Sequence, residues 1–235
     1  MKLWQSTSVS LALTLLLGMP AQGADAPASG VQLPNFGDDY SALAARAAAH
    51  DESIDFRALR LAFLKSPAYQ KVGVATASLA QLNREMVDAT HQPVSVGAPI
   101  VRQKAEQFLS IDYIDINAHK LLRQSCAALK DDACVEANHF VEFGLLNSII
   151  HSGTGDTCAK GWEVVDIREE YFVLATVLNT KFQKQSLVSE DGHACDVMAV
   201  TDEKGAPRTY YFNVDHVMAA LQAELDKSAK KPTTP

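Results

Sequence analysis

Residues 116–150 read INAHKLLRQSCAALKDDACVEANHFVEFGLLNSII, and their apolar spacing predicts two helices. The first covers Ile116–Lys130 and the second Ala133–Ile150, with the polar residues Lys130, Asp131 and Asp132 as the turn between them. Each predicted helix has one apolar face, made by Ala118, Leu122 and Cys126 in the first and by Cys134, Ala137, Val141 and Leu145 in the second. Because a short turn makes neighbouring helices antiparallel, we expect these faces to pack as a helical hairpin.

Helical patterns also precede this hairpin, so we expect one helical region over residues 38–152. Pro67 ends one of these helices, because proline cannot continue the helical hydrogen-bond ladder. The β-branched and small residues of Val72–Ser78 do not favour a helix, so the next predicted helix begins after them, at Leu79. The predicted helices before the hairpin cover Tyr40–His50, Asp55–Lys65, Leu79–Thr90 and Pro99–Ser110.

Beyond Ile150 the pattern changes to short strands and helices. After a loop at residues 151–156, the predicted strands cover Trp162–Val165, Lys181–Val188, Ala194–Thr201 and Arg208–Val214, and the predicted helices cover Arg168–Leu178 and Asp215–Lys227. The loop Asp202–Pro207 contains glycine and proline, which makes the last two strands a hairpin. The predicted fold class is therefore α+β: antiparallel helical hairpins, then a small antiparallel sheet with flanking helices, with residues 153–227 packed on the helical region.

The first 23 residues have the pattern of a cleavable secretory signal. Lys2 precedes an apolar run, Val9–Leu17, and the small residues Ala21 and Gly23 stand where a signal peptidase cuts. No apolar run in the chain reaches the roughly 20 residues of a membrane span, and no cysteine near the cleavage site could carry a lipid. We therefore expect a periplasmic protein without a membrane span, with flexible ends at residues 24–37 and 228–235.

Four cysteines, an even number, suggest two disulfides in an oxidising compartment. Cys126 and Cys134 flank the turn of the predicted hairpin, which can bring their sulfurs together. The remaining pair, Cys158 and Cys195, would then tie the loop after the hairpin to the sheet. The alternative is that Cys126 and Cys134 are buried free thiols.

Short phrases follow one another in a distinctive order along most of the chain: DFRALRLA (55–62), SPAY (66–69), DINAH (115–119), GLLNSII (144–150), SGTG (152–155), EEY (169–171), QSL (185–187), DGH (191–193) and YFNV (211–214). In this order they resemble a bacterial family of exported proteins known only as a domain of unknown function. The resemblance implies a helical half similar to tetratricopeptide hairpins, a scaffold usually used to bind other proteins. It implies no activity, and the four cysteines depart from the family's pattern.

The sequence lacks several familiar catalytic and phosphate-binding motifs, namely Gly-x-Ser-x-Gly, His-Glu-x-x-His and Gly-Lys-Ser. The glycine-rich run Ser152–Gly155 follows a helix and precedes no convincing one, so we interpret it as a helix C-cap. Glu136 and His139 lie one helical turn apart, but the similar pair Glu190 and His193 falls in a loop, so a helical dimetal site is incomplete. We expect no metal and no cofactor, with Glu136 and His139 as the alternative metal ligands.

The most enzyme-like group of residues is His193, Asp196, Asn213 and Asp215, near the ends of the predicted strands. His193 and Asp196 are three positions apart, so a regular strand would turn them to opposite faces. Asp215 begins the last predicted helix, where capping of the helix N-terminus accounts for it.

These patterns favour a non-enzymatic protein-binding module in the periplasm, and one specific form of this hypothesis is an immunity protein that neutralises a toxin delivered by a competitor. The net charge of −7 argues against nucleic acid as a partner. The alternatives are an envelope hydrolase that uses His193, Asp196 and Asp215, or a carrier of a small ligand or metal. The sequence leaves open whether the protein forms a homo-oligomer.

Overall fold

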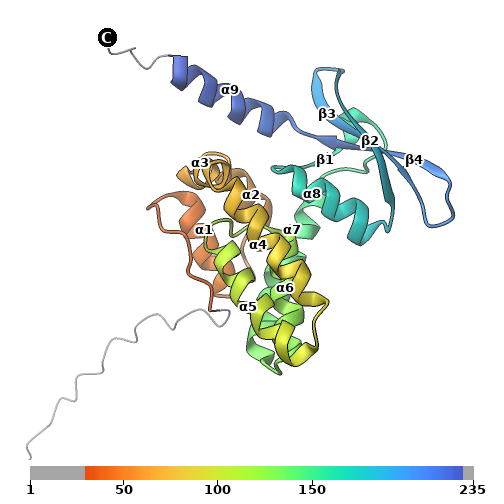
Figure 1. Cartoon of the computed structure of the whole chain (residues 1–235). Helices are drawn as coiled ribbons and strands as arrows, with labels where there is room; N and C mark the ends of the chain where they lie inside the picture. The colour runs from red at the N-terminus through yellow and green to blue at the C-terminus, as the bar shows by residue number, and fades with distance from the viewer. Residues whose placement is uncertain (1–29, 230–235) are drawn as a thin grey trace, which may run out of the picture.

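The computed structural model describes residues 30–229, and within them the predicted α+β class is confirmed (Figure 1). The predicted signal segment, residues 1–23, and the chain beyond residue 229 lie outside the described residues. The helical part contains α1 (Asp39–Ala48), α2 (Phe56–Phe63), α3 (Pro67–Val74), α4 (Thr76–Thr90), α5 (Val94–Leu109), α6 (Ile116–Ala128) and α7 (Asp132–Ile150). The rest contains η1 (Cys158–Lys160), β1 (Trp162–Glu163), α8 (Ile167–Phe172), η2 (Val173–Val177), β2 (Lys181–Glu190), β3 (His193–Thr201), β4 (Pro207–Asn213) and α9 (Asp215–Ala229).

Short polar side chains determine where several helices begin. The carboxylates of Asp38, Asp55, Asp115 and Asp131 each accept a hydrogen bond from a backbone N–H in the first turn of α1, α2, α6 and α7. These N–H groups have no partner inside the helix, so each aspartate supplies the missing acceptor.

The helices α3, α4 and α5 differ from the sequence expectation. Pro67 follows the end of α2 as predicted, but it also begins the unpredicted α3, because Ser66 caps that helix and proline suits its first turn. Most of the run Val72–Ser78 is helical, because α3 continues to Val74 and α4 already begins at Thr76. Helix α5 begins at Val94 and contains Pro99, which was expected to start it.

Helices α6 and α7 form the predicted antiparallel hairpin, and the Cys126–Cys134 disulfide closes its turn with a Cα–Cα distance of 5.9 Å. Buried residues of both helices, including Leu122, Leu145 and Ile149, form the centre of the core. Gly144 allows the ring of Phe56 in α2 to pack directly on α7, because a Cβ atom there would lie 2.1 Å from the ring.

The glycine-rich run after α7 begins as the predicted C-cap and then forms a tight connection. The N–H and the hydroxyl of Ser152 both donate to the carbonyl oxygen of Ile149 in the last turn of the helix. His151, the residue that follows α7, has ordinary right-handed backbone geometry. Backbone N–H groups of Thr154 and Gly155 both donate to the carbonyl oxygen of Lys160, and Gly155 in turn accepts from the N–H of Tyr211 in β4. Gly155 has a φ of +72°, and its lack of a side chain lets Trp162 pack against it. The run therefore joins the helical part to the sheet.

The sheet has the order β1-β4-β3-β2. Strands β2, β3 and β4 are antiparallel as predicted, whereas the short β1 pairs in parallel with β4, Trp162 opposite Phe212, which makes the sheet mixed. The second disulfide joins Cys158 to Cys195 in β3, with a Cα–Cα distance of 5.6 Å. Helix α9 leaves the sheet after β4 and runs back over α3 (Figure 1).

Candidate functional site

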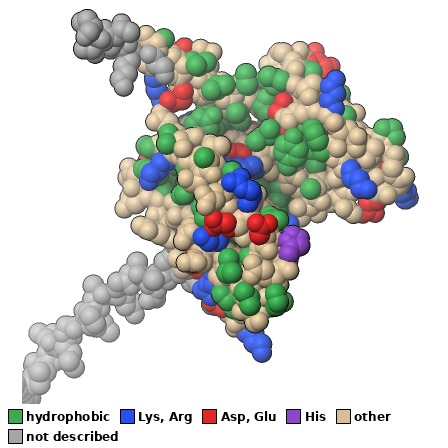
Figure 2. Space-filling view, in the orientation of Figure 1, with side chains coloured by type: hydrophobic (Ala, Val, Ile, Leu, Met, Phe, Trp, Pro, Cys, Tyr) green, Lys and Arg blue, Asp and Glu red, His purple; other side chains and the backbone are tan. Residues whose placement is uncertain are grey.

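Strand β2 lies at one edge of the sheet, and its outer side has no neighbouring strand within residues 30–229. Eight of its ten residues are exposed, as the burial pattern along the strand shows. Exposed apolar side chains accompany this edge: Phe182 and Leu187 belong to β2, and Tyr171 of α8 lies with its ring centroid 5.3 Å from that of Phe182. We call this edge with Tyr171, Phe182 and Leu187 the β2 surface. Hydrophobic side chains gather over α8 and the adjoining sheet in Figure 2.

A polar cluster lies directly behind the β2 surface. The side-chain nitrogen of Gln185 donates to Asp196 Oδ2 at 2.8 Å and to Glu170 Oε2 at 3.4 Å, and its oxygen accepts from the hydroxyl of Tyr171 at 3.2 Å. Burial raises the pKa of Glu170 to about 9, and the nearby charge of Asp196 adds to this effect. Glu170 therefore carries a proton at neutral pH, which allows two carboxyl groups to lie close together beneath the strand.

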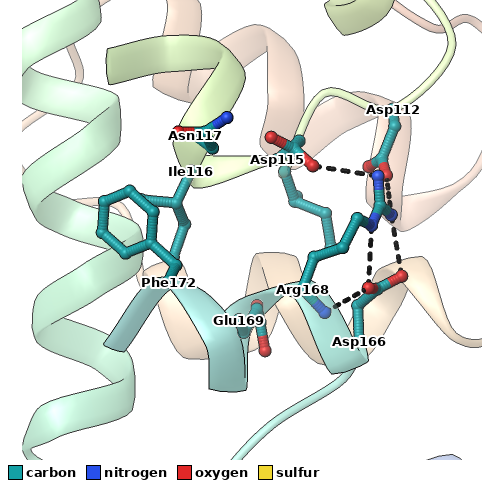
Figure 3. A pocket seen from close by; sticks show the side chains of 9 residues that line it. Asp112, Asp115, Ile116, Asn117, Asp166, Arg168, Glu169 and Phe172 are labelled. Carbon is teal, nitrogen blue, oxygen red and sulfur yellow. Dashed lines mark hydrogen bonds and ion pairs between the residues drawn. The ribbon is translucent and has the colours of Figure 1, made fainter. Parts of the chain in front are cut away.

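A second cluster, centred on Arg168, joins the helical part to the sheet part (Figure 3). Its guanidinium group donates to Asp112 and Asp115, which lie between α5 and α6, and to Asp166 at the start of α8. Burial raises the pKa of Asp112 to about 7 although the charge of Arg168 opposes this, and burial raises the pKa of Asp115 as well. The cavity beside these residues has a volume of about 20 Å³, which leaves no room for a substrate.

A buried ion pair strengthens the same junction. Arg60 of α2 donates to both carboxylate oxygens of Glu169 at 2.8 Å, and it also donates to the carbonyl oxygen of Glu163 at 2.7 Å. Glu169 Oε2 accepts a further bond from the N–H of Val165. Because both charged groups are paired and almost completely buried, this arrangement has a structural role and fixes α8 on the helical part.

The structure separates the predicted enzyme-like group into two places. His193 Nδ1 lies 2.7 Å from Asp215 Oδ2, and Asn213 Nδ2 donates to the same oxygen at 3.0 Å. Asp196 lies on the opposite face of β3 with Gln185, as the alternation of a strand requires. The carboxylate of Asp215 also accepts from the N–H of Ala194 in β3, so these contacts fasten the start of α9 to the sheet.

The alternative metal ligands are exposed on α7, where the His139 ring lies 4.3 Å from that of Phe143. Within residues 30–229, the cluster of potential metal ligands consists of Cys126, Asp131 and Cys134, and the two sulfurs of that cluster are joined to each other. Neither Glu136 nor His139 takes part in it.

A groove of about 480 Å³ lies between α9 and the α2–α3 corner. Small residues of α9 line one side, and a 2.7 Å hydrogen bond from Gln70 of α3 to Glu224 of α9 joins the two sides. A small-ligand carrier of the kind considered from the sequence would use this groove.

Comparison with known families gives one result. Residues 35–222 match the family described as Domain of unknown function (DUF4919). The chain belongs to this family. The DUF4919 region takes in all the helices up to α8, the whole sheet and the first half of α9, so the β2 surface, the Arg168 cluster and the His193–Asp215 pair all lie within it. No curated protein and no solved structure matches the chain.

The DUF4919 match agrees with the family resemblance seen in the sequence, while bacterial origin, export and a tetratricopeptide-like helical half stay predictions. No helix within residues 30–229 is long and apolar enough to cross a membrane. Sequence reasoning missed the β2 surface and the clusters around Glu170 and Arg168. The four ionisable residues among Asp166–Glu170, in a helix that must pack against the core, were the signal that could have pointed to buried ion pairs.

Proposed function

We propose that this DUF4919 protein is a protein-binding module that pairs an extended segment of a partner protein with the free edge of β2. The observation that supports the proposal most directly is the exposed edge itself, with Phe182 and Leu187 projecting from it and Tyr171 beside it. An edge strand offers a row of backbone N–H and C=O groups that an extended chain can match, and neighbouring side chains then select among sequences.

The side chains of this edge indicate what the partner segment must contain. Phe182 and Leu187 lie on the face of the sheet that α8 covers, since they pair with Val200 and Asp196 of β3. A partner strand therefore needs apolar side chains on that face. On the other face, Lys184 at one end and Glu190 at the other favour an acidic and a basic residue in the partner, which fixes its direction.

We place this activity in the bacterial envelope, and the specific form that we propose is an immunity protein that binds a toxin there. Two disulfides support an oxidising compartment, because such bonds rarely persist in the cytosol. The toxin would supply the extended segment, or part of a sheet edge, that covers β2.

The test compares two equally exposed leucines. Leu187 on β2 is 56% exposed and Leu225 on α9 is 57% exposed, so each can be replaced by lysine with similar cost to the fold. A sensitive cell expresses in its periplasm the toxin encoded by a neighbouring gene, together with the wild-type protein, L187K or L225K. We expect the wild type and L225K to protect growth and to capture the toxin in a pull-down, and L187K to fail in both. Protection by L187K, or protection without a toxin complex, contradicts the proposal.

The 2.7 Å contact between His193 and Asp215 favours a second candidate, an envelope hydrolase in which Asp215 orients His193 as a general base. The variant H193A separates the two functions, because it leaves Asp196 behind the β2 surface and the bond from Asp215 to Ala194 in place. A binding module keeps its partner, whereas an enzyme that relies on His193 loses roughly 100-fold or more in rate.

A further inference from the structure

We propose that, in the absence of another partner, two copies of this chain pair through their β2 strands in antiparallel fashion, about a two-fold axis at Leu187. This dimer rests on the proposed function, because a second copy would cover the same edge of β2 that a partner protein covers. A long edge strand that stays open invites unspecific pairing, and a closed symmetric pair removes this hazard.

Symmetry restricts the register of such a pair. Residues that lie opposite each other across an antiparallel ladder point to the same face, whereas neighbours along a strand point to opposite faces. A two-fold axis perpendicular to the sheet must therefore pass midway between one residue and the same residue of the second copy. With Leu187 on the axis, Lys184 of each copy lies opposite Glu190 of the other, and Ser186 lies opposite Val188. The dimer then contains two identical ion pairs, one on each side of the axis.

Neighbouring registers lack this match. An axis at Ser186 sets Lys184 against Val188, and an axis at Val188 sets Glu190 against Ser186, so neither register pairs the charge of Lys184 with that of Glu190. The irregularity of β2 between Phe182 and Lys184 supports the same choice, because the regular part of the strand begins at Lys184. Its far end is set by the turn at Asp191, which has a φ of 52°.

The apolar side chains contribute at the centre of the interface. Leu187 faces its own copy across the axis, where directly opposed Cβ atoms lie about 5 Å apart. Tyr171 and Phe182 lie on the same face of the sheet and can extend the contact on either side. One strand and its flanks bury less than the roughly 1,600 Å² of a standard interface, so we expect a weak dimer that dissociates on dilution.

Sedimentation equilibrium of the purified full chain, with its disulfides intact, tests the register by charge reversal. We expect wild-type protein to dimerise with a dissociation constant in the micromolar range. K184E and E190K each place like charges opposite one another and should weaken the dimer roughly tenfold or more, and K184E/E190K should restore it. Any of three results overturns the proposal. The wild type stays monomeric up to about 1 mM at neutral pH, the single variants dimerise as the wild type does, or the double variant fails to recover dimerisation.

Cross-linking provides a second measurement that does not depend on charge. L187C should form a disulfide-linked dimer under mild oxidation, since position 187 meets its own copy. The matched control is S189C, which lies opposite Gln185 and should cross-link poorly. Equal cross-linking of both variants contradicts the register. Both experiments use the chain alone, so a monomeric wild type overturns the dimer while toxin binding still stands or falls by the comparison of L187K with L225K.

Discussion

The side chain of Asp215, at the start of α9, bonds to two consecutive residues of β3: His193 Nδ1 at 2.7 Å from Oδ2, and the N–H of Ala194 at 2.7 Å from Oδ1. Burial alone would raise the pKa of Asp215, but the bonds from Ala194, His193 and Asn213 outweigh burial and lower it. A single carboxylate thus holds the last helix to the sheet, and its ionised form is the one that does so.

We expect D215N to destabilise the protein by about 1–2 kcal/mol, because the charge-assisted bonds are lost. In the wild type, the pKa of Asp215 is lower in the folded protein than in the unfolded chain. The stabilisation by its ionised carboxylate is therefore fully present above the unfolded pKa of about 3.9, and it is lost as the pH falls through the pKa of the folded protein. Urea denaturation at pH 7 and pH 3 measures both effects. If D215N is as stable as the wild type at pH 7, this carboxylate does not hold α9.

The raised pKa values of Glu170 and Asp112 predict the opposite dependence on pH. The folded protein keeps protons on these groups that the unfolded chain has already lost, so the free energy of unfolding falls as pH rises from about 4 to about 7 for Asp112 and to about 9 for Glu170. The variant E170Q stays neutral at every pH and keeps a polar partner for Gln185. We expect it to lose less stability than the wild type between pH 7 and pH 9, by on the order of 2 kcal/mol, in denaturant titrations. Parallel stability curves for the two proteins would contradict a protonated Glu170.

Replacing only one partner of the ion pair between Arg60 and Glu169 should greatly lower the stability of the protein. R60M leaves Glu169 buried without its partner, and we expect a loss of about 3–5 kcal/mol in the free energy of unfolding. The double variant R60M/E169Q removes the unpaired charge and still accepts the bond from Val165, so it should recover part of that loss. A double variant no more stable than R60M would show that the charge is not the cause.

The two disulfides should contribute unequally to stability. In the chain-entropy description, a bond across eight residues stabilises by about 2–3 kcal/mol and one across 37 residues by about 4 kcal/mol. We therefore expect C158S/C195S to lower the midpoint of urea denaturation more than C126S/C134S. Non-reducing peptide mapping of the wild type checks the pairing, and a dominant linkage other than these two contradicts it.

Local chemistry explains which parts of the fold were predictable. The hairpin of α6 and α7 has regular apolar spacing, a short polar turn and a cysteine on each side, so its sequence alone specified it. The strands β2, β3 and β4 carry β-branched residues between glycine-containing turns, and strand alternation placed His193 and Asp196 on opposite faces. Helix α3 was missed because Pro67 marks both the end of one helix and the start of another.

The candidate site was not predictable, because it depends on contacts between distant residues. Asp112 and Arg168 are 56 positions apart, and Arg60 and Glu169 are 109 apart. Burial raises the pKa of Glu170, and although the four ionisable residues among Asp166–Glu170 signal buried charge, the sequence does not show which of them is buried. The β2 surface could not be inferred either, because the sequence of β2 does not show whether the strand lies at the centre or at an edge of the sheet.

The Cys126–Cys134 bond also affects how the chain would respond to proteases. The exposed turn that it closes contains Lys130, whose φ of 60° shows that the backbone bends sharply there, and a trypsin-like enzyme cuts after lysine. A cut after Lys130 would lie between the two linked cysteines, so the fragments would stay covalently joined and α6 would stay packed on α7. At this exposed turn of the hairpin, a single cut therefore releases nothing.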